Sequence, residues 1–208
     1  ICVFSFHPVK IITSGEGGMA MTNNTELYAK MKSLRAHGIT RDENSFVNPS
    51  PGPWYYEQQQ LGFNYRMSDI HAALGLSQLE RLDYIVEKRN SIYNQYIDML
   101  SSSPLSLLHI PQDVLSSVHL VVIQIASDYR HLHPLLFKYL LSNNVGVQLH
   151  YYPVHLQPYY QNLGFRYGDY PAAELYSSQS LSIPVYPDLS SNQIQYISNL
   201  LENFFDSV

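Results

Sequence analysis

The sequence predicts an α/β chain, and three observations lead to this fold class. Short apolar and β-branched runs alternate with stretches whose apolar residues recur at helical spacing. A chain of 208 residues is long enough for one large domain or two small ones. The helical pattern breaks at residues 101–104, which are three serines and a proline. We therefore expect one domain over residues 1–103 and a smaller α+β domain over residues 104–208.

The first domain is expected to begin with a β-hairpin. Residues 2–6 form a β-prone run, and a second apolar run at residues 19–22 follows the glycine-rich turn Gly15-Glu16-Gly17-Gly18. The turn is not a phosphate-binding P-loop, because no Lys-Ser/Thr pair follows it at the start of a helix. We expect a tight turn that requires positive φ angles.

Helices and one long loop complete this domain. Capping residues at 23–26 precede apolar residues at helical spacing, and Gly38 is a natural helix stop. Residues 39–60 hold three prolines and predict a long loop, which in a compact protein is usually functional or disordered. Residues 67–100 predict one long helix, or two helices that meet near Asp83.

The second domain is expected to alternate strand and helix. Its apolar, β-branched runs predict strands, and its runs with helical spacing predict helices. We expect strands at residues 118–126 and 145–152, a short extended segment at 181–185, and helices at 133–143, 171–180 and 190–205.

Composition and charge exclude several classes of protein. The net charge of −5 argues against a nucleic-acid binder, which would carry a basic face. No apolar run approaches membrane-spanning length, and no secretory signal peptide is visible. The single cysteine, Cys2, excludes an internal disulfide and fits a reducing, cytoplasmic compartment. The histidines lack carboxylates or cysteines at zinc-like spacing, so we predict no metal site.

Lys10 is the strongest candidate for covalent chemistry. It lies on a tight loop between the two strands predicted at the start of the chain. Partial burial favours the neutral amine of a lysine, and the neutral amine is the form that attacks carbonyls. A lone lysine in a hairpin is more often a solvated surface charge, so its neighbours decide between the two interpretations.

Three spaced motifs, in the same order, resemble the DegT-type sugar aminotransferases. They are Ser-Phe-His-Pro-Val-Lys at residues 5–10 with the glycine-rich turn after it, the pair at residues 37–42 and 53–58, and Leu-Gly-Phe-Asn-Tyr-Arg-Met-Ser-Asp at residues 61–69. The match covers nearly the whole chain and is nearest to the branch of the pseudaminic-acid pathway. It implies the C-terminal part of a fold-type I enzyme that depends on pyridoxal 5'-phosphate (PLP), comprising the end of the large domain and the small α+β domain.

The resemblance also implies roles for residues near the cofactor. Lys10 would be both its covalent anchor and a general acid/base. Ser5 and Asn64 match residues that bind the cofactor phosphate, Asn64 across a dimer interface. Without the resemblance, Ser5 would equally be a buried hydroxyl bonded to backbone, and Asn64 a helix cap. Arg66 could add charge near an anion, with an ion pair to Asp69 as the equal alternative.

Aromatic and imidazole side chains predict a substrate site. His150, Tyr151 and His155 lie in a region that resembles the family's His-Tyr-x-Pro segment, and Tyr56 lies in the long loop. Aromatic faces can stack on uracil or cover a hexose, and imidazoles can donate to hydroxyls or a diphosphate. A tyrosine-rich domain interface is the alternative that composition alone leaves open.

The implied reaction is transfer of an amino group from glutamate to C4 of a UDP-linked 4-keto-6-deoxy-N-acetylhexosamine, in the biosynthesis of surface glycans. Another keto nucleotide sugar, or a non-catalytic fragment that only dimerises, remain alternatives. Dehydratases of this family carry histidine at the lysine position, so Lys10 argues against that activity.

The start of the chain leads to a further expectation. It has no initiator methionine and begins with what reads as the middle of a buried strand. We expect a homodimer with shared active sites, in which the chain packs against a missing N-terminal half of the same polypeptide. Because the family's aspartate for the pyridine nitrogen precedes its lysine, the chain alone should be inactive.

Overall fold

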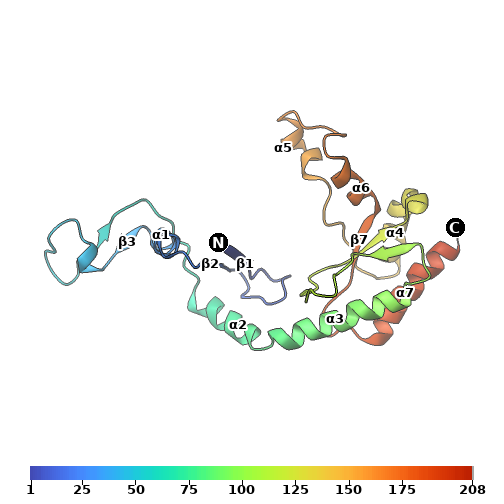
Figure 1. Cartoon of the computed structure of the whole chain (residues 1–208), viewed down its shortest axis with the longest axis horizontal. Helices are drawn as coiled ribbons and strands as arrows, with labels where there is room; N and C mark the ends of the chain where they lie inside the picture. The colour runs from blue at the N-terminus through green and yellow to red at the C-terminus, as the bar shows by residue number, and fades with distance from the viewer. Residues whose placement is uncertain (208) are drawn as a thin grey trace. The chain divides into compact units, whose positions relative to one another are not determined.

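The computed structural model describes residues 1–207, which form two compact units, and the chain divides after Leu82. Figure 1 shows the elements of both units along the chain. The division falls earlier than the domain boundary expected near residue 103. The reason is that helix α3 (Leu82–Met99) buries Ile92, Tyr93 and Tyr96 in the core of the second unit.

A β-hairpin opens the first unit, as predicted. Strand β1 (Cys2–Ser5) pairs antiparallel with β2 (Gly18–Met21), so that Ser5 lies opposite Gly18. The glycine-rich turn has the positive φ angles that we expected, with φ of 80° at Gly15 and 157° at Gly17. At Gly17 a Cβ atom would also lie 2.5 Å from the hydroxyl of the buried Ser14, which adds a second reason for glycine there.

Helix α1 (Thr25–Arg35) confirms the next prediction. The Asn24 side chain caps its N-terminus by accepting the Leu27 N–H at 2.9 Å. Past its C-terminus, the Gly38 N–H donates to the Ser33 carbonyl at 2.9 Å with Gly38 at a φ of 68°. Gly38 is therefore part of the helix stop, as its sequence position indicated.

The segment predicted as one long loop has a short ladder at its base. Strand β3 (Ile39–Thr40) pairs antiparallel with β4 (Glu57–Gln58), and a single 3₁₀ turn, η1 (Glu43–Ser45), lies between them. Two-residue strands are too short for a period-2 pattern, which explains why the sequence did not reveal them.

Two helices follow, and they correspond to the second of the two alternatives for residues 67–100. Helix α2 (Asp69–Leu79) ends just before α3 begins, close to Asp83. No helix among residues 1–207 is both long and apolar enough to cross a membrane.

The second unit contains an antiparallel three-stranded sheet in the order β5-β6-β7, formed by Leu105–Leu107, Val121–Ile125 and Ser180–Ile183. Helix α4 (His133–Ser142) packs against α7 (Ser191–Asp206). Helices α5 (Pro158–Gln161) and α6 (Pro171–Gln179) lie on the opposite side of β7 from α7 in Figure 1. Two 3₁₀ turns, η2 (Ser127–Leu132) and η3 (Val154–Leu156), precede α4 and α5.

Most predictions for this unit are confirmed, but the strand at residues 145–152 is wrong. That segment makes one isolated bridge, between Gln148 and Ser182, and then turns into η3. Its apolar residues Val145 and Val147 are buried in the core, and this burial gave the segment its strand-like pattern. The three-residue strand β5 was not predicted, again because it is too short to show a period.

Candidate active site

Lys10 lies on a loop that closes on itself at its base. The Phe6 N–H donates to the Gly17 carbonyl at 2.9 Å, and the Ser14 N–H donates to the Phe6 carbonyl at 3.0 Å. Within the loop, the Lys10 N–H donates to the His7 carbonyl at 2.9 Å, which places Lys10 at the end of a tight turn. Its side chain is half-buried. The backbone thus holds Lys10 in place while the side chain stays accessible.

The turn beneath Lys10 packs against helix α2. Ser14 is fully buried, and its hydroxyl donates to the Glu16 carbonyl at 2.9 Å. A Cβ atom at Gly15 would lie 3.3 Å from the His71 ring, and one at Gly75 would lie 3.4 Å from the Ser14 Cβ. The lysine loop is therefore supported by a helix as well as by its own hydrogen bonds.

Ser5 is exposed at the end of β1, in the same hairpin as Lys10. Its hydroxyl oxygen accepts the His7 N–H at 3.5 Å, which leaves the O–H free to donate. Among the described residues the hydroxyl is thus bonded to backbone, as the alternative expected, but it is not buried.

Asn64 is held by backbone bonds to the end of α1. The Phe63 N–H donates to the Leu34 carbonyl at 2.7 Å and the Tyr65 N–H to the Arg35 carbonyl at 2.9 Å. The Asn64 side chain is exposed and has no hydrogen-bond partner among residues 1–207. It is not the cap of α2, because that role belongs to Ser68, whose hydroxyl accepts the His71 N–H at 3.4 Å.

The ion pair with Asp69 that the sequence left open for Arg66 does not form within the part of the chain that the structure describes. The Arg66 side chain is exposed.

Glu57 organises the loop that carries Tyr56. Its buried carboxylate accepts the backbone N–H groups of Val47 at 2.7 Å and Asn48 at 2.8 Å, and the Tyr55 hydroxyl at 3.1 Å. The hydrogen bond from Val47, helped by the other donors, lowers the pKa of Glu57 to about 2 against the effect of burial. No sequence pattern indicated this role of Glu57, because its two backbone donors lie nine and ten residues away.

Tyr56 itself is exposed, and the Arg41 guanidinium carbon lies 5.2 Å from the centre of its ring. This distance is that of a cation–π contact. The guanidinium thus lies over the Tyr56 ring, and the pair combines an aromatic surface with a positive charge.

In the second unit, His150 is half-buried and anchored at one ring nitrogen. Its Nδ1 lies 2.8 Å from the Ser182 hydroxyl, and its ring meets Tyr151 edge-on, with the centroids 4.8 Å apart. Tyr151 is 72% exposed, so its face is open to a ligand.

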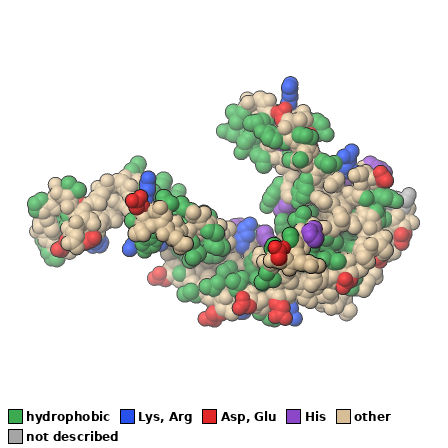
Figure 2. Space-filling model, viewed as in Figure 1, with side chains coloured by type: hydrophobic (Ala, Val, Ile, Leu, Met, Phe, Trp, Pro, Cys, Tyr) green, Lys and Arg blue, Asp and Glu red, His purple; other side chains and the backbone are tan. Residues whose placement is uncertain are grey.

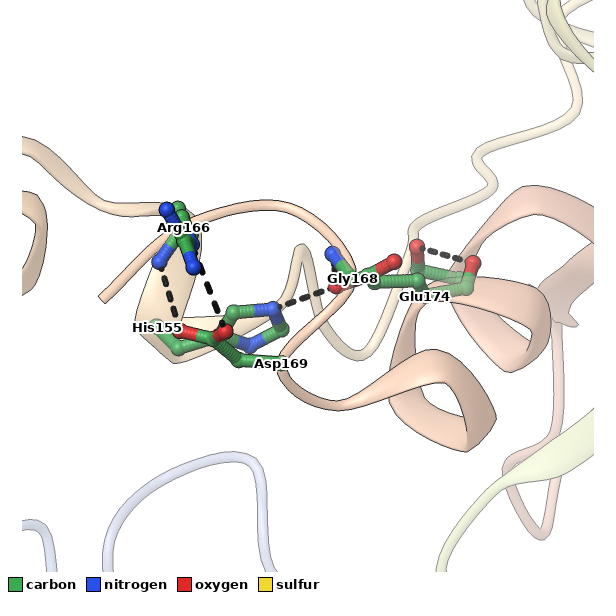
Figure 3. Close-up of polar contacts among 6 residues, drawn as sticks. His155, Arg166, Gly168, Asp169 and Glu174 are labelled. Atoms are coloured by element: carbon green, nitrogen blue, oxygen red, sulfur yellow. Dashed lines mark hydrogen bonds and ion pairs between the residues drawn. The ribbon is translucent and has the colours of Figure 1, made fainter.

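His155 is buried and bonded to a carboxylate (Figure 3). Its Nε2 lies 2.8 Å from Glu174 Oε1, and the same oxygen accepts the Gly168 N–H at 2.8 Å. Burial by itself would raise the pKa of Glu174, but the hydrogen bonds from His155 and Gly168 outweigh it and hold the pKa below its usual value. Among the predicted substrate residues, His155 alone has its ring enclosed by the protein.

The predicted site residues are therefore divided between the two units. Lys10, Ser5, Asn64 and Tyr56 lie in the first, and His150, Tyr151 and His155 lie in the second. Within residues 1–207, no three histidine, cysteine, aspartate or glutamate side chains gather as metal ligands would.

Comparison with known proteins defines the class of this chain. The model of the DegT/DnrJ/EryC1/StrS aminotransferase family matches residues 1–202, and the chain belongs to this family. The predicted family is confirmed, and with it the α/β class and the expectation of a partial aminotransferase fold. Dependence on PLP fits this membership, since solved relatives include PLP and PMP forms.

Particular relatives narrow the comparison. The chain is 34% identical over 209 residues to a UDP-4-amino-4,6-dideoxy-N-acetyl-beta-L-altrosamine transaminase of Campylobacter jejuni, covering 100% of this chain and 53% of the relative. It is 34% identical over 195 residues to the spore coat polysaccharide biosynthesis protein SpsC of Bacillus subtilis, covering 92% of the chain and 50% of the relative. The structure of Helicobacter pylori PseC, an aminotransferase of pseudaminic-acid biosynthesis, matches with a TM-score of 0.88 and 30% identity, over 99% of this chain and 53% of that one. The chain spans about half the length of the curated relatives that it matches.

Proposed function

We propose that the whole protein is a PLP-dependent aminotransferase that transfers an amino group from glutamate to C4 of a UDP-linked 4-keto-6-deoxy-N-acetylhexosamine. The observation that carries the proposal is the accessible side chain of Lys10 on a rigid turn, within a family of aminotransferases. The similarity to altrosamine transaminases of two bacteria, at 34% and 31% identity, favours this substrate.

The residues of the first unit fit the cofactor in their chemistry. PLP supplies an electron sink that stabilises negative charge at the carbon next to the amino group. The Lys10 amine would bind the cofactor and, once displaced, would carry the proton at the donor Cα. The Ser5 O–H and the Asn64 amide, neither of which donates to another group within the described residues, are hydrogen-bond donors of the kind that a phosphate requires.

We assign binding of the nucleotide sugar to His150, Tyr151 and Tyr56. The exposed rings of Tyr56 and Tyr151 offer faces for uracil or the hexose, and Arg41 beside Tyr56 offers a charge for the diphosphate. His155 belongs to the same assignment indirectly. Its ring is bonded to Glu174, and the same carboxylate oxygen accepts the Gly168 N–H, so His155 would support this segment of the site.

We further propose a homodimer that works in the cytoplasm. Figure 2 shows hydrophobic side chains in several patches of the visible surface. In the first unit, four apolar side chains of the hairpin are each about half-exposed or more, namely Val3, Phe4, Met19 and Met21. Exposed apolar residues of this kind are typical of an interface, either with a second copy or with the remainder of the polypeptide. An exposed Asn64 amide without a hydrogen-bond partner among residues 1–207 is consistent with a site shared between subunits.

Borohydride reduction of the whole protein tests the assignment of Lys10. We expect a reduced cofactor adduct on the peptide with Lys10, its loss in Lys10→Ala, and its retention in Lys88→Ala, which changes an exposed lysine of α3. An adduct on another lysine would contradict the assignment. No adduct on any lysine would favour the non-catalytic, dimerising alternative.

Turnover with two acceptors tests the sugar. We expect glutamate-dependent amination of the UDP-linked 4-keto-6-deoxy-N-acetylhexosamine and little with a GDP-linked keto-sugar. The second acceptor is the relevant alternative because the chain is 27% identical to GDP-perosamine synthase of Vibrio cholerae over 208 residues. Preference for the GDP-linked sugar would overturn the proposed substrate and keep the enzyme class.

A further inference from the structure

Ser182 makes two separate connections to the segment that carries His150. Its backbone exchanges hydrogen bonds with Gln148, from the Ser182 N–H to the Gln148 carbonyl at 2.8 Å and from the Gln148 N–H to the Ser182 carbonyl at 3.2 Å. Its hydroxyl lies 2.8 Å from Nδ1 of His150. One residue of β7 therefore fixes both the path of this segment and the edge of the imidazole ring.

The hydroxyl of Ser182 is shielded from water. Ser182 is 6% exposed, and His150 Nδ1 is the one hydrogen-bond partner that the described residues provide for its hydroxyl. A buried hydroxyl that loses its partner is costly, so the contact with the ring persists. Tyr151 meets the same ring edge-on, with an interplanar angle of 90°. The two contacts leave the imidazole little freedom to rotate.

The opposite edge of the ring is left for a ligand. Nε2 of His150 has no hydrogen-bond partner among residues 1–207, and the histidine is half-buried. An imidazole held at Nδ1 presents Nε2 in a fixed direction, and a preorganised group binds more tightly than a mobile one because less freedom is lost.

We propose that Ser182 is a positioning residue, which holds His150 so that its Nε2 meets the nucleotide sugar. The inference rests on the proposed function, in which His150 binds this substrate. Ser182 would act only through His150 and would have no part in the reaction with the amino donor.

Ser180 provides a matched control. It lies two residues before Ser182 in β7, hence on the same face of the strand, and is 1% exposed. Its hydroxyl lies 3.5 Å from the Gln124 amide nitrogen. Ser180→Ala therefore removes a buried hydroxyl of the same strand without touching His150.

The two half-reactions of the cofactor-loaded whole protein separate positioning from general damage. In Ser182→Ala we expect an unchanged rate with glutamate and about a tenfold lower kcat/KM with the UDP-linked keto-sugar, which is the loss of about one hydrogen bond's stabilisation. Ser182→Thr keeps the hydroxyl, suits a strand, and should restore most of the rate. Ser180→Ala should leave both half-reactions within about twofold of the wild type, well inside the loss expected at Ser182.

A double variant tests whether the effect passes through His150. His150→Ala should lower kcat/KM for the sugar, and adding Ser182→Ala should cause no further loss. Additive losses, equal slowing of both half-reactions, or equal effects of Ser182→Ala and Ser180→Ala would each overturn the inference.

The ¹⁵N resonances of the His150 ring test the contact independently of substrate. Ser182→Ala should shift the Nδ1 resonance and Ser180→Ala should not. An unmoved resonance overturns the inference alone, and the proposed function stands. A wild-type enzyme that is inert toward the UDP-linked keto-sugar overturns the proposed function, and with it the role of Ser182 toward that sugar.

Discussion

Removing helix α3 from the second unit should abolish its cooperative folding. Four side chains from this part of the chain are buried in the core of the second unit, each 8% exposed or less. Three belong to α3, namely Ile92, Tyr93 and Tyr96, and the fourth is Leu100, which directly follows the helix. Hydroxyls of the two tyrosines also donate to backbone carbonyls across the unit, from Tyr93 to Leu108 at 2.7 Å and from Tyr96 to Pro184 at 3.1 Å.

The magnitude follows from this burial. Full burial of a large apolar side chain contributes about 1.5–3 kcal/mol, hence about 6–12 kcal/mol for the four. The whole stability of a domain is about 5–15 kcal/mol. Polar anchors are lost as well, since Arg89 Nη1 donates to the Val118 carbonyl at 3.1 Å and Asn90 Nδ2 to the Ser116 carbonyl at 2.8 Å. A polypeptide of residues 104–208 should therefore be mostly unfolded.

Urea titration followed by far-UV circular dichroism provides the assay. We expect residues 83–208 to unfold in one cooperative transition, and residues 104–208 to show a broad change without a native baseline. Equal midpoints and equal slopes for the two polypeptides would refute the reasoning. They would also favour a domain boundary near residue 103.

Three further predictions concern buried polar groups. The pKa of Glu57, about 2, lies below the usual value of 4.5 for a glutamate. The ionised Glu57 should therefore stabilise the loop fully above pH 4.5, and this stabilisation should be lost as the pH falls through about 2. The fluorescence emission of Trp54, the single tryptophan of the sequence, should change as the loop loses this stabilisation. Glu57→Gln should shift that emission already at pH 7, whereas Glu43→Gln, at an exposed carboxylate of the same loop, should not. Tyr96→Phe should lower the free energy of unfolding by about 1–2 kcal/mol in urea titrations, because the partly buried Pro184 carbonyl loses its donor. Tyr84→Phe, on the exposed side of α3, should change it by less than about 0.5 kcal/mol. Unchanged emission in Glu57→Gln, or equal effects of the two tyrosine changes, would count against these assignments.

Local chemistry explains why much of the fold could be predicted. The hairpin depends on a glycine-rich turn between two apolar runs, and helix α1 on a capping asparagine and a glycine stop. These signals lie within a few residues of the elements that they determine. The prediction of a strand at residues 145–152 was wrong because it also relied on a local pattern. Buried valines give the same apolar pattern whether or not a neighbouring strand pairs with them.

The candidate site divides in the same way. The lysine loop could be predicted from the residues alone, since Ser5, Lys10 and the glycine-rich turn lie close together in the chain and their chemistry follows from residue type. By contrast, the packing of the folded chain brings Ser182 to His150 across 32 residues and Glu174 to His155 across 19 residues. The same packing places side chains of α3 in the core of the second unit. A local pattern records backbone preference and apolar spacing, whereas a hydrogen bond between distant residues depends on how the whole chain packs, and no single segment contains that information.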